Sequence, residues 1–154
     1  MNRDPLDTEY AWPVRVHRTA ARSARAYARN HSFDVGQQAS VAPSDDLPSA
    51  IEYMLGALAA DLVVGLSGRA ERRGLVVDGI ELSLTGELDN VLVHLGVVGE
   101  AGHPGLRAIK GKLYVSADAD EAMLRSLWEE ALARSPLFHT LSRCAEIDIR
   151  LVIV

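Results

Sequence analysis

The middle of the chain carries apolar side chains at helical spacing. The stripe consists of Met54, Leu55, Leu58, Leu62 and Leu66. It predicts a long amphipathic helix from Ser49 to Arg73, with its apolar face toward a core. Gly74 follows a polar run and is expected to end the helix, because glycine readily adopts the left-handed conformation found at helix ends.

Two later segments alternate apolar and polar residues, as half-buried strands do. In residues 79–88 the apolar positions are Ile80, Leu82 and Leu84, which alternate with Glu81, Ser83 and Thr85. The second segment runs from Leu106 to Ser116. In it we expect Ile109, Leu113 and Val115 to point inward and Lys110, Lys112 and Tyr114 to point outward. A glycine-rich connection, residues 89–105, joins the two strands.

A second helix is predicted to begin at Asp118, which can cap the first turn together with Glu121 three residues later. Its apolar positions are Met123, Leu127, Trp128, Ala131 and Leu132. The helix is expected to end near Ser135, because Pro136 disfavours helical geometry in the residue before it.

The last predicted strand runs from Glu146 to Val154. With Val152 and Val154, its end is apolar on both faces. A strand with two apolar faces cannot be covered from one side alone. We therefore expect this end in the centre of a sheet or at a contact between subunits.

The N-terminal part is less regular. Residues 1–13 contain two prolines and are expected to form a tail, and residues 14–154 to form a single domain. Within residues 14–36 arginines recur at helical spacing, whereas alanines alternate with polar residues as in a strand. The residues alone leave both possibilities open. Residues 37–48 are rich in Ser, Pro, Asp and Gln and predict a loop.

Composition excludes several classes of protein. A net charge of -5 argues against a nucleic-acid partner, which requires a basic face. The N-terminus has no apolar signal core, and Asp61 and glycines interrupt the longest apolar stretch, so we expect a cytoplasmic protein without a membrane partner. The five histidines are scattered, and we expect neither a metal nor another cofactor. Cys144 is the only cysteine, so no intrachain disulfide can form.

Asp61 is the one carboxylate within the apolar run ALAADLVVGL, residues 57–66. On a helix it shares a line with Ala57 and Gly65, which are small residues. Two interpretations follow. The small residues allow another helix to approach closely and to offer Asp61 a hydrogen-bond donor, or they leave room for a pocket.

The order of these elements and the residues around Asp61 resemble the OsmC/Ohr family of thiol peroxidases, the osmotically inducible protein C and organic hydroperoxide resistance proteins. The resemblance covers residues 14–154. It is carried by DLPSAIEYMLGALAA at residues 46–60, by AERRG at residues 70–74, and by the Ser135-Pro136 pair. The family has a peroxide-attacking cysteine where Asp61 stands here, and a resolving cysteine where Ser135 stands.

The resemblance implies further properties. Glu52 matches an acidic position that holds an active-site arginine, and the candidates for that arginine in the N-terminal strands are Arg15, Arg18, Arg22 and Arg25. It implies an α+β fold with an N-terminal β-hairpin, a long central helix and antiparallel strands packed on helices. It also implies an intertwined homodimer, with sites between the subunits, and a link to oxidative or osmotic stress response.

Chemistry separates this chain from a working peroxidase. Peroxide reduction needs a thiolate that becomes a sulfenic acid and then condenses with a second thiol. A carboxylate at Asp61 and a hydroxyl at Ser135 can perform neither step. Three hypotheses follow, in this order: non-redox binding of a small, partly apolar ligand; an enzyme of another class with Asp61 or Glu52 as general base; and a structural or regulatory partner protein.

Overall fold

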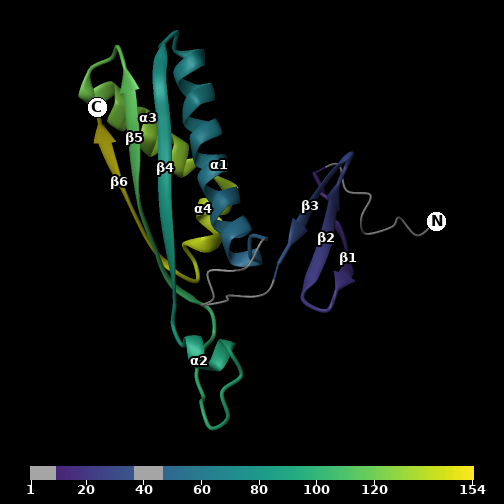
Figure 1. The fold of residues 1–154 in the computed structure, drawn as a ribbon. Coiled ribbons are helices and arrows are strands. Elements are labelled where there is room, and N and C mark those ends of the chain that lie inside the picture. Colours follow the sequence, from purple (N-terminus) through teal and green to yellow (C-terminus); the bar gives the residue numbers. More distant parts are fainter. Residues whose placement is uncertain (1–9, 37–46) are drawn as a thin grey trace, which may run out of the picture. The chain divides into compact units, whose positions relative to one another are not determined.

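The computed structural model describes residues 10–36 and 47–154, and has an α+β fold (Figure 1). These residues divide into two compact units, with the boundary between Tyr53 and Met54. Most of the predicted tail and of the predicted loop lies outside the described residues, and the single domain over residues 14–154 stays a prediction.

The N-terminal unit contains a three-stranded antiparallel sheet, in the order β1-β2-β3. Its strands are β1 (Arg15–Ala20), β2 (Ser23–Ala28) and β3 (His31–Val35). The strand interpretation of residues 14–36 and the N-terminal β-hairpin are therefore confirmed, and a third strand, β3, extends the hairpin. Arg25 and Asp34 face each other across β2 and β3, and such an opposite-charge pair favours this register.

Helix α1 (Ala50–Arg72) confirms the long helix to within one residue at each end. Its start is a capping box: Ser49 Oγ accepts from the backbone N–H of Glu52, and Glu52 accepts from the backbone N–H of Ser49. At the other end Gly74 has a φ of 69°. The N–H of Leu75 donates to the carbonyl of Ala70, which completes the left-handed cap that Gly74 predicts.

The C-terminal unit contains a second three-stranded sheet, in the order β4-β5-β6. The strands are β4 (Val77–Leu88), β5 (Leu106–Ala117) and β6 (Glu146–Ile153). β4 and β5 are antiparallel, but β5 and β6 are parallel, which corrects the expectation of antiparallel strands. The chain returns through helices between β5 and β6, and a crossover of this kind produces parallel strands.

The position of β6 also corrects a prediction. It lies at the edge of the sheet, and β5 occupies the centre. Val152 is half-buried, and Val154 is 70% exposed. The expected burial of this end in a sheet centre is therefore wrong, and its alternative, a contact between subunits, stays a prediction.

The core of the C-terminal unit lies between one face of the sheet and the helices. As predicted, Ile109, Leu113 and Val115 of β5 point inward and are almost completely buried. They pack with leucines of α1 and with residues of α3 (Glu121–Ala133), while Lys110 and Lys112 point outward. The helical part of the core consists of Leu58, Leu62, Leu66, Ala70, Leu124, Leu127, Trp128 and Ala131.

Three local features differ from the sequence prediction. α3 is capped by Asp120, whose carboxylate accepts from the N–H of Met123 at 2.8 Å, so the cap lies two residues after Asp118. The segment after Pro136 forms a short helix, α4 (Pro136–Leu141). The glycine-rich connection contains another, α2 (Val91–His94), which Asn90 caps through the N–H groups of Leu92 and Val93.

Among the described residues, α1 is long and apolar enough to cross a membrane, judged by length and composition alone. This is weak evidence, because the core helix of a soluble protein passes the same test. Within the C-terminal unit Leu58, Leu62 and Leu66 of α1 are part of the core.

Candidate functional site

Asp61 and Ser135 are brought together in the C-terminal unit. The Ser135 hydroxyl donates to Asp61 Oδ2 at an oxygen–oxygen distance of 2.5 Å, across 74 positions of sequence. Ser135 is 3% exposed, and Asp61 is half-buried. A buried carboxylate is costly without a donor, and this hydroxyl supplies one.

The local fold explains why Ser135 points at Asp61. Helix α3 ends at Ala133, and Ser135 is the N-cap of α4, with Pro136 at the first helical position. Ser135 Oγ accepts from the backbone N–H of Phe138 at 2.9 Å. Because a hydroxyl carries one proton, accepting at the cap leaves that proton for Asp61. The Ser-Pro sequence thus places a satisfied hydroxyl at the junction of α3 and α4.

The small residues in line with Asp61 have different surroundings. Ala57 is exposed. At Gly65 the guanidinium of Arg69 lies over the helix and donates to the Gly65 carbonyl at 2.7 Å. A Cβ at Gly65 would stand 3.2 Å from that guanidinium. The room beside Gly65 is therefore taken by an arginine of the same helix.

A second polar link joins α1 to α3, and the sequence prediction missed it. Glu130 lies among three arginines: Arg73 donates to it at 2.8 Å, and Arg69 and Arg134 lie 3.6 and 3.5 Å away. Nε of Arg69 is buried and has no hydrogen-bond partner, so its charge relies on the ion pair with Glu130. The run of basic residues at the end of α1 is the only signal in the sequence.

Glu52 lies on α1 within the N-terminal unit, where it belongs to the capping box. It accepts from the backbone N–H of Ser49 at 2.7 Å. That hydrogen bond holds the pKa of the Glu52 carboxyl below its usual value, so the group stays ionised at neutral pH.

The candidate arginines also belong to the N-terminal unit. Arg25 forms a two-point ion pair with Asp34, at 2.7 and 2.8 Å, and this pair lowers the pKa of the Asp34 carboxyl. Arg15 lies over the ring of Tyr27, 5.0 Å from its centre. Arg18 on β1 and Arg22 in the following turn are exposed.

Cys144 is exposed, and its Sγ lies 3.2 Å from the carbonyl oxygen of Leu141. Within residues 10–36 and 47–154, no group of three His, Cys, Asp or Glu side chains is arranged to hold a metal ion.

Comparison with known families agrees with this architecture. The sequence model of the OsmC-like proteins matches residues 43–150, which is more than half of the chain. The chain belongs to the OsmC-like protein family. The match includes both Asp61 and Ser135. A comparison with curated proteins gives no significant match.

Solved structures share the OsmC-like fold at low sequence identity. An OsmC-like protein from Mycoplasma pneumoniae superposes with a TM-score of 0.80 at 15% identity, covering 96% of this chain and 99% of its own. The organic hydroperoxide resistance protein OhrB of Bacillus subtilis has a TM-score of 0.60 at 16% identity, with 92% and 98% covered. An organic hydroperoxide resistance protein OsmC from Legionella pneumophila has a TM-score of 0.65 at 8% identity, with 94% and 98% covered.

We predict that Ser135→Ala lowers the free energy of unfolding of this OsmC-like protein by about 1–3 kcal/mol. The change removes the cap of α4 and leaves Asp61 without its donor. Urea denaturation measures the loss. Ser126→Ala, on the exposed face of α3, is the matched control and should stay within about 0.5 kcal/mol of wild type. Equal effects of the two changes would mean that the Asp61 contact does not stabilise the fold.

Proposed function

We propose that this OsmC-like protein binds a small, partly apolar ligand without redox chemistry. In this proposal Asp61 and Ser135 occupy the two positions at which peroxidases of the family carry reactive cysteines. The family links the chain to peroxide and stress response, since relatives of the same fold are named organic hydroperoxide resistance proteins.

The observation that carries the proposal is the 2.5 Å hydrogen bond from Ser135 to Asp61. It joins α1 to the junction of α3 and α4 by a link that needs no oxidant to form and no reductant to break. The only sulfur of a cysteine belongs to Cys144, which is exposed and contacts the Leu141 carbonyl instead. A sulfenic acid formed in this chain would have no second thiol of the same chain with which to condense, and this supports the non-redox proposal.

The surroundings of Ser135 favour a ligand that is partly apolar. Leu137, Phe138 and Leu141 of α4 follow Ser135 and are half-buried against the core. A few polar groups in an apolar setting are typical of small-molecule sites, where the polar groups orient the ligand.

We predict that the protein binds cumene hydroperoxide and releases it intact. Binding is followed by NMR chemical shifts, and the peroxide that remains is assayed with a dithiol present. Saturable shifts with full recovery of peroxide are expected, and Cys144→Ser should change neither result. Asp61→Asn should bind this neutral probe about three- to tenfold more tightly, because the charge beside it is removed.

The matched control is Asp78→Asn, an exposed aspartate outside α1, which should leave affinity unchanged. Absence of binding would favour the structural or regulatory role. Turnover that disappears in Cys144→Ser would overturn the non-redox proposal.

The placement of the two positions has its own test. In a Cys144→Ser background, Asp61→Cys with Ser135→Cys should form an intrachain disulfide when one equivalent of hydroperoxide is added. A disulfide needs Cα atoms within about 7 Å and suitably aimed side chains, and the direct contact of Ser135 with Asp61 favours both. Free thiols are counted under denaturing conditions. Two thiols lost per chain without cross-linked dimers is the expected result, and retention of both thiols would contradict the placement.

We further propose that the protein is a homodimer and that α1 contributes to the contact. Only 17% of the most apolar window of α1 is buried within the chain. Ala57, Ala60, Val64 and Ser67 are all exposed and recur at spacings of three and four, so they form one helix face. Val64 is 70% exposed. A second copy of the same chain would cover this face, and a twofold contact uses the same patch on both subunits.

Val64→Glu is predicted to raise the dimer dissociation constant at least about tenfold, because it places a charge in an apolar contact. Light scattering should give twice the chain mass of 16.7 kDa for wild type and a shift toward a single chain for the variant. The matched control is Val76→Glu, a valine of similar exposure beyond the end of α1. A wild-type mass of one chain at micromolar concentration would refute the dimer.

A further inference from the structure

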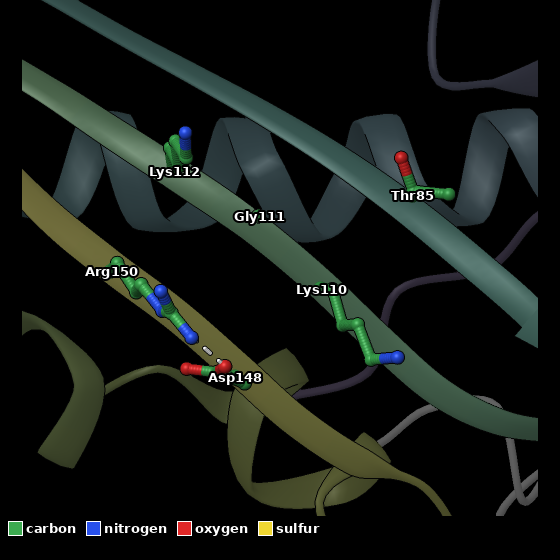
Figure 2. Close-up of a pocket in the computed structure, with 6 residues that line it drawn as sticks. All are labelled: Thr85, Lys110, Gly111, Lys112, Asp148 and Arg150. Atoms are coloured by element: carbon green, nitrogen blue, oxygen red, sulfur yellow. Dashed lines mark ion pairs between the residues drawn. The ribbon is translucent and has the colours of Figure 1, made fainter.

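The sheet of the C-terminal unit has a shallow hollow on the face that points away from the core. Its volume is about 300 Å³, at the small end of the range for ligand pockets. All three strands contribute to its lining: Thr85 from β4, Lys110, Gly111 and Lys112 from β5, and Asp148 and Arg150 from β6 (Figure 2). In this view α1 lies behind the strands, so the hollow is separated from the core helices by the sheet.

Strand register sets an unusual charge arrangement in this hollow. Lys112 of β5 is directly opposite Arg150 of β6. Two like charges in such neighbouring positions repel each other and destabilise the pair. The row beside them is balanced, because Lys110 is opposite Asp148 on one side and Thr85 on the other. Positive charge is therefore concentrated at Lys112 and Arg150.

The contacts within the chain neutralise the charges of Lys112 and Arg150 only in part. The neighbouring Lys110 is already paired, since it donates to Glu87 at 2.9 Å. Arg150 has its Nε 3.6 Å from the Asp148 carboxylate, which is an ion pair beyond hydrogen-bond length. Lys112 forms no hydrogen bond or ion pair with the described part of the chain, and its ammonium points away from Asp148 (Figure 2).

We propose that this hollow binds the phosphate group of a small molecule between Lys112 and Arg150. A guanidinium donates two parallel hydrogen bonds to a phosphate, and an ammonium adds a third from the adjacent strand. The anion relieves the repulsion between the two cations. The Thr85 hydroxyl can donate as well, and the Asp148 carboxylate accepts from a hydroxyl or amine of the same ligand.

This assignment does not depend on the function proposed for Asp61 and Ser135. Asp61 lies on α1, and Ser135 follows α3, on the helical side of the unit. The hollow lies on the opposite face of the sheet. Failure of either proposal leaves the other unaffected.

The test is a titration of the full chain with inorganic phosphate, at constant ionic strength maintained with chloride and followed by NMR chemical shifts. Lys112→Gln and Arg150→Gln should each weaken binding about three- to tenfold. Asp148→Asn should strengthen it, because the carboxylate that competes for Arg150 is removed. These side chains are exposed, so the variants are expected to keep the fold.

The matched control is Arg107→Gln, which removes the same charge from the same strand outside the hollow, where Arg107 already pairs with Glu87. It should leave phosphate affinity unchanged. If Arg107→Gln weakened phosphate binding as much as Lys112→Gln and Arg150→Gln, the losses would reflect only the general reduction in positive charge, and the proposal would be overturned. The absence of saturable chemical-shift changes in the wild-type protein would overturn it as well. Acetate is the second arm: tighter binding of acetate than of phosphate would overturn the choice of phosphate.

Discussion

The burial of three leucines of α1 against the central strand is the constraint on which the C-terminal unit depends. Leu58, Leu62 and Leu66 recur every four residues and are at most 2% exposed. Full burial of a leucine contributes about 1.5–3 kcal/mol, so the three together outweigh any one hydrogen bond of the unit. They fix the rotation of α1 about its axis, because turning the helix would expose them. The rotation of α1 then determines the direction of every other side chain on the helix.

Asp61 precedes Leu62 directly, so the leucine stripe also decides where its carboxylate lies. The Ser135 hydroxyl donates a hydrogen bond to that carboxylate. Pro136 and the capping hydrogen bond of α4 hold the hydroxyl in place. Arg69, about two turns further along α1, and Arg73, directly after the helix, form ion pairs with Glu130 of α3. These polar links contribute less free energy than the leucines. They are directional, however, and therefore orient α3 on a helix that apolar burial has already positioned.

Sequence patterns predict those parts of the fold that depend on local periodicity. Alternation identified the inward residues of β5, and Gly74 marked the end of α1, because both effects act within a few residues. The parallel pairing of β6 and its edge position depend on the path of the chain through α3 and α4, which no short window contains. The candidate site shows the same division between local and long-range effects. The spacing of Asp61, Ala57 and Gly65 is compatible both with close packing of another helix and with a pocket. Only the family resemblance predicts the pairing of Asp61 with Ser135, which lies 74 positions away.

The two faces of strand β5 are under different constraints, because one face packs against the core and the other is exposed to solvent. Its inward positions, Ile109, Leu113 and Val115, are fixed by the core, since a polar residue there would be buried without partners. Its outward positions, Lys110 and Lys112, are under no such demand. A charged pair such as Lys112 and Arg150, which repels across two strands, is tolerated there because water screens it. Core packing therefore does not explain why Lys112 and Arg150 stand opposite each other on neighbouring strands. An anion bound between the two side chains would explain it.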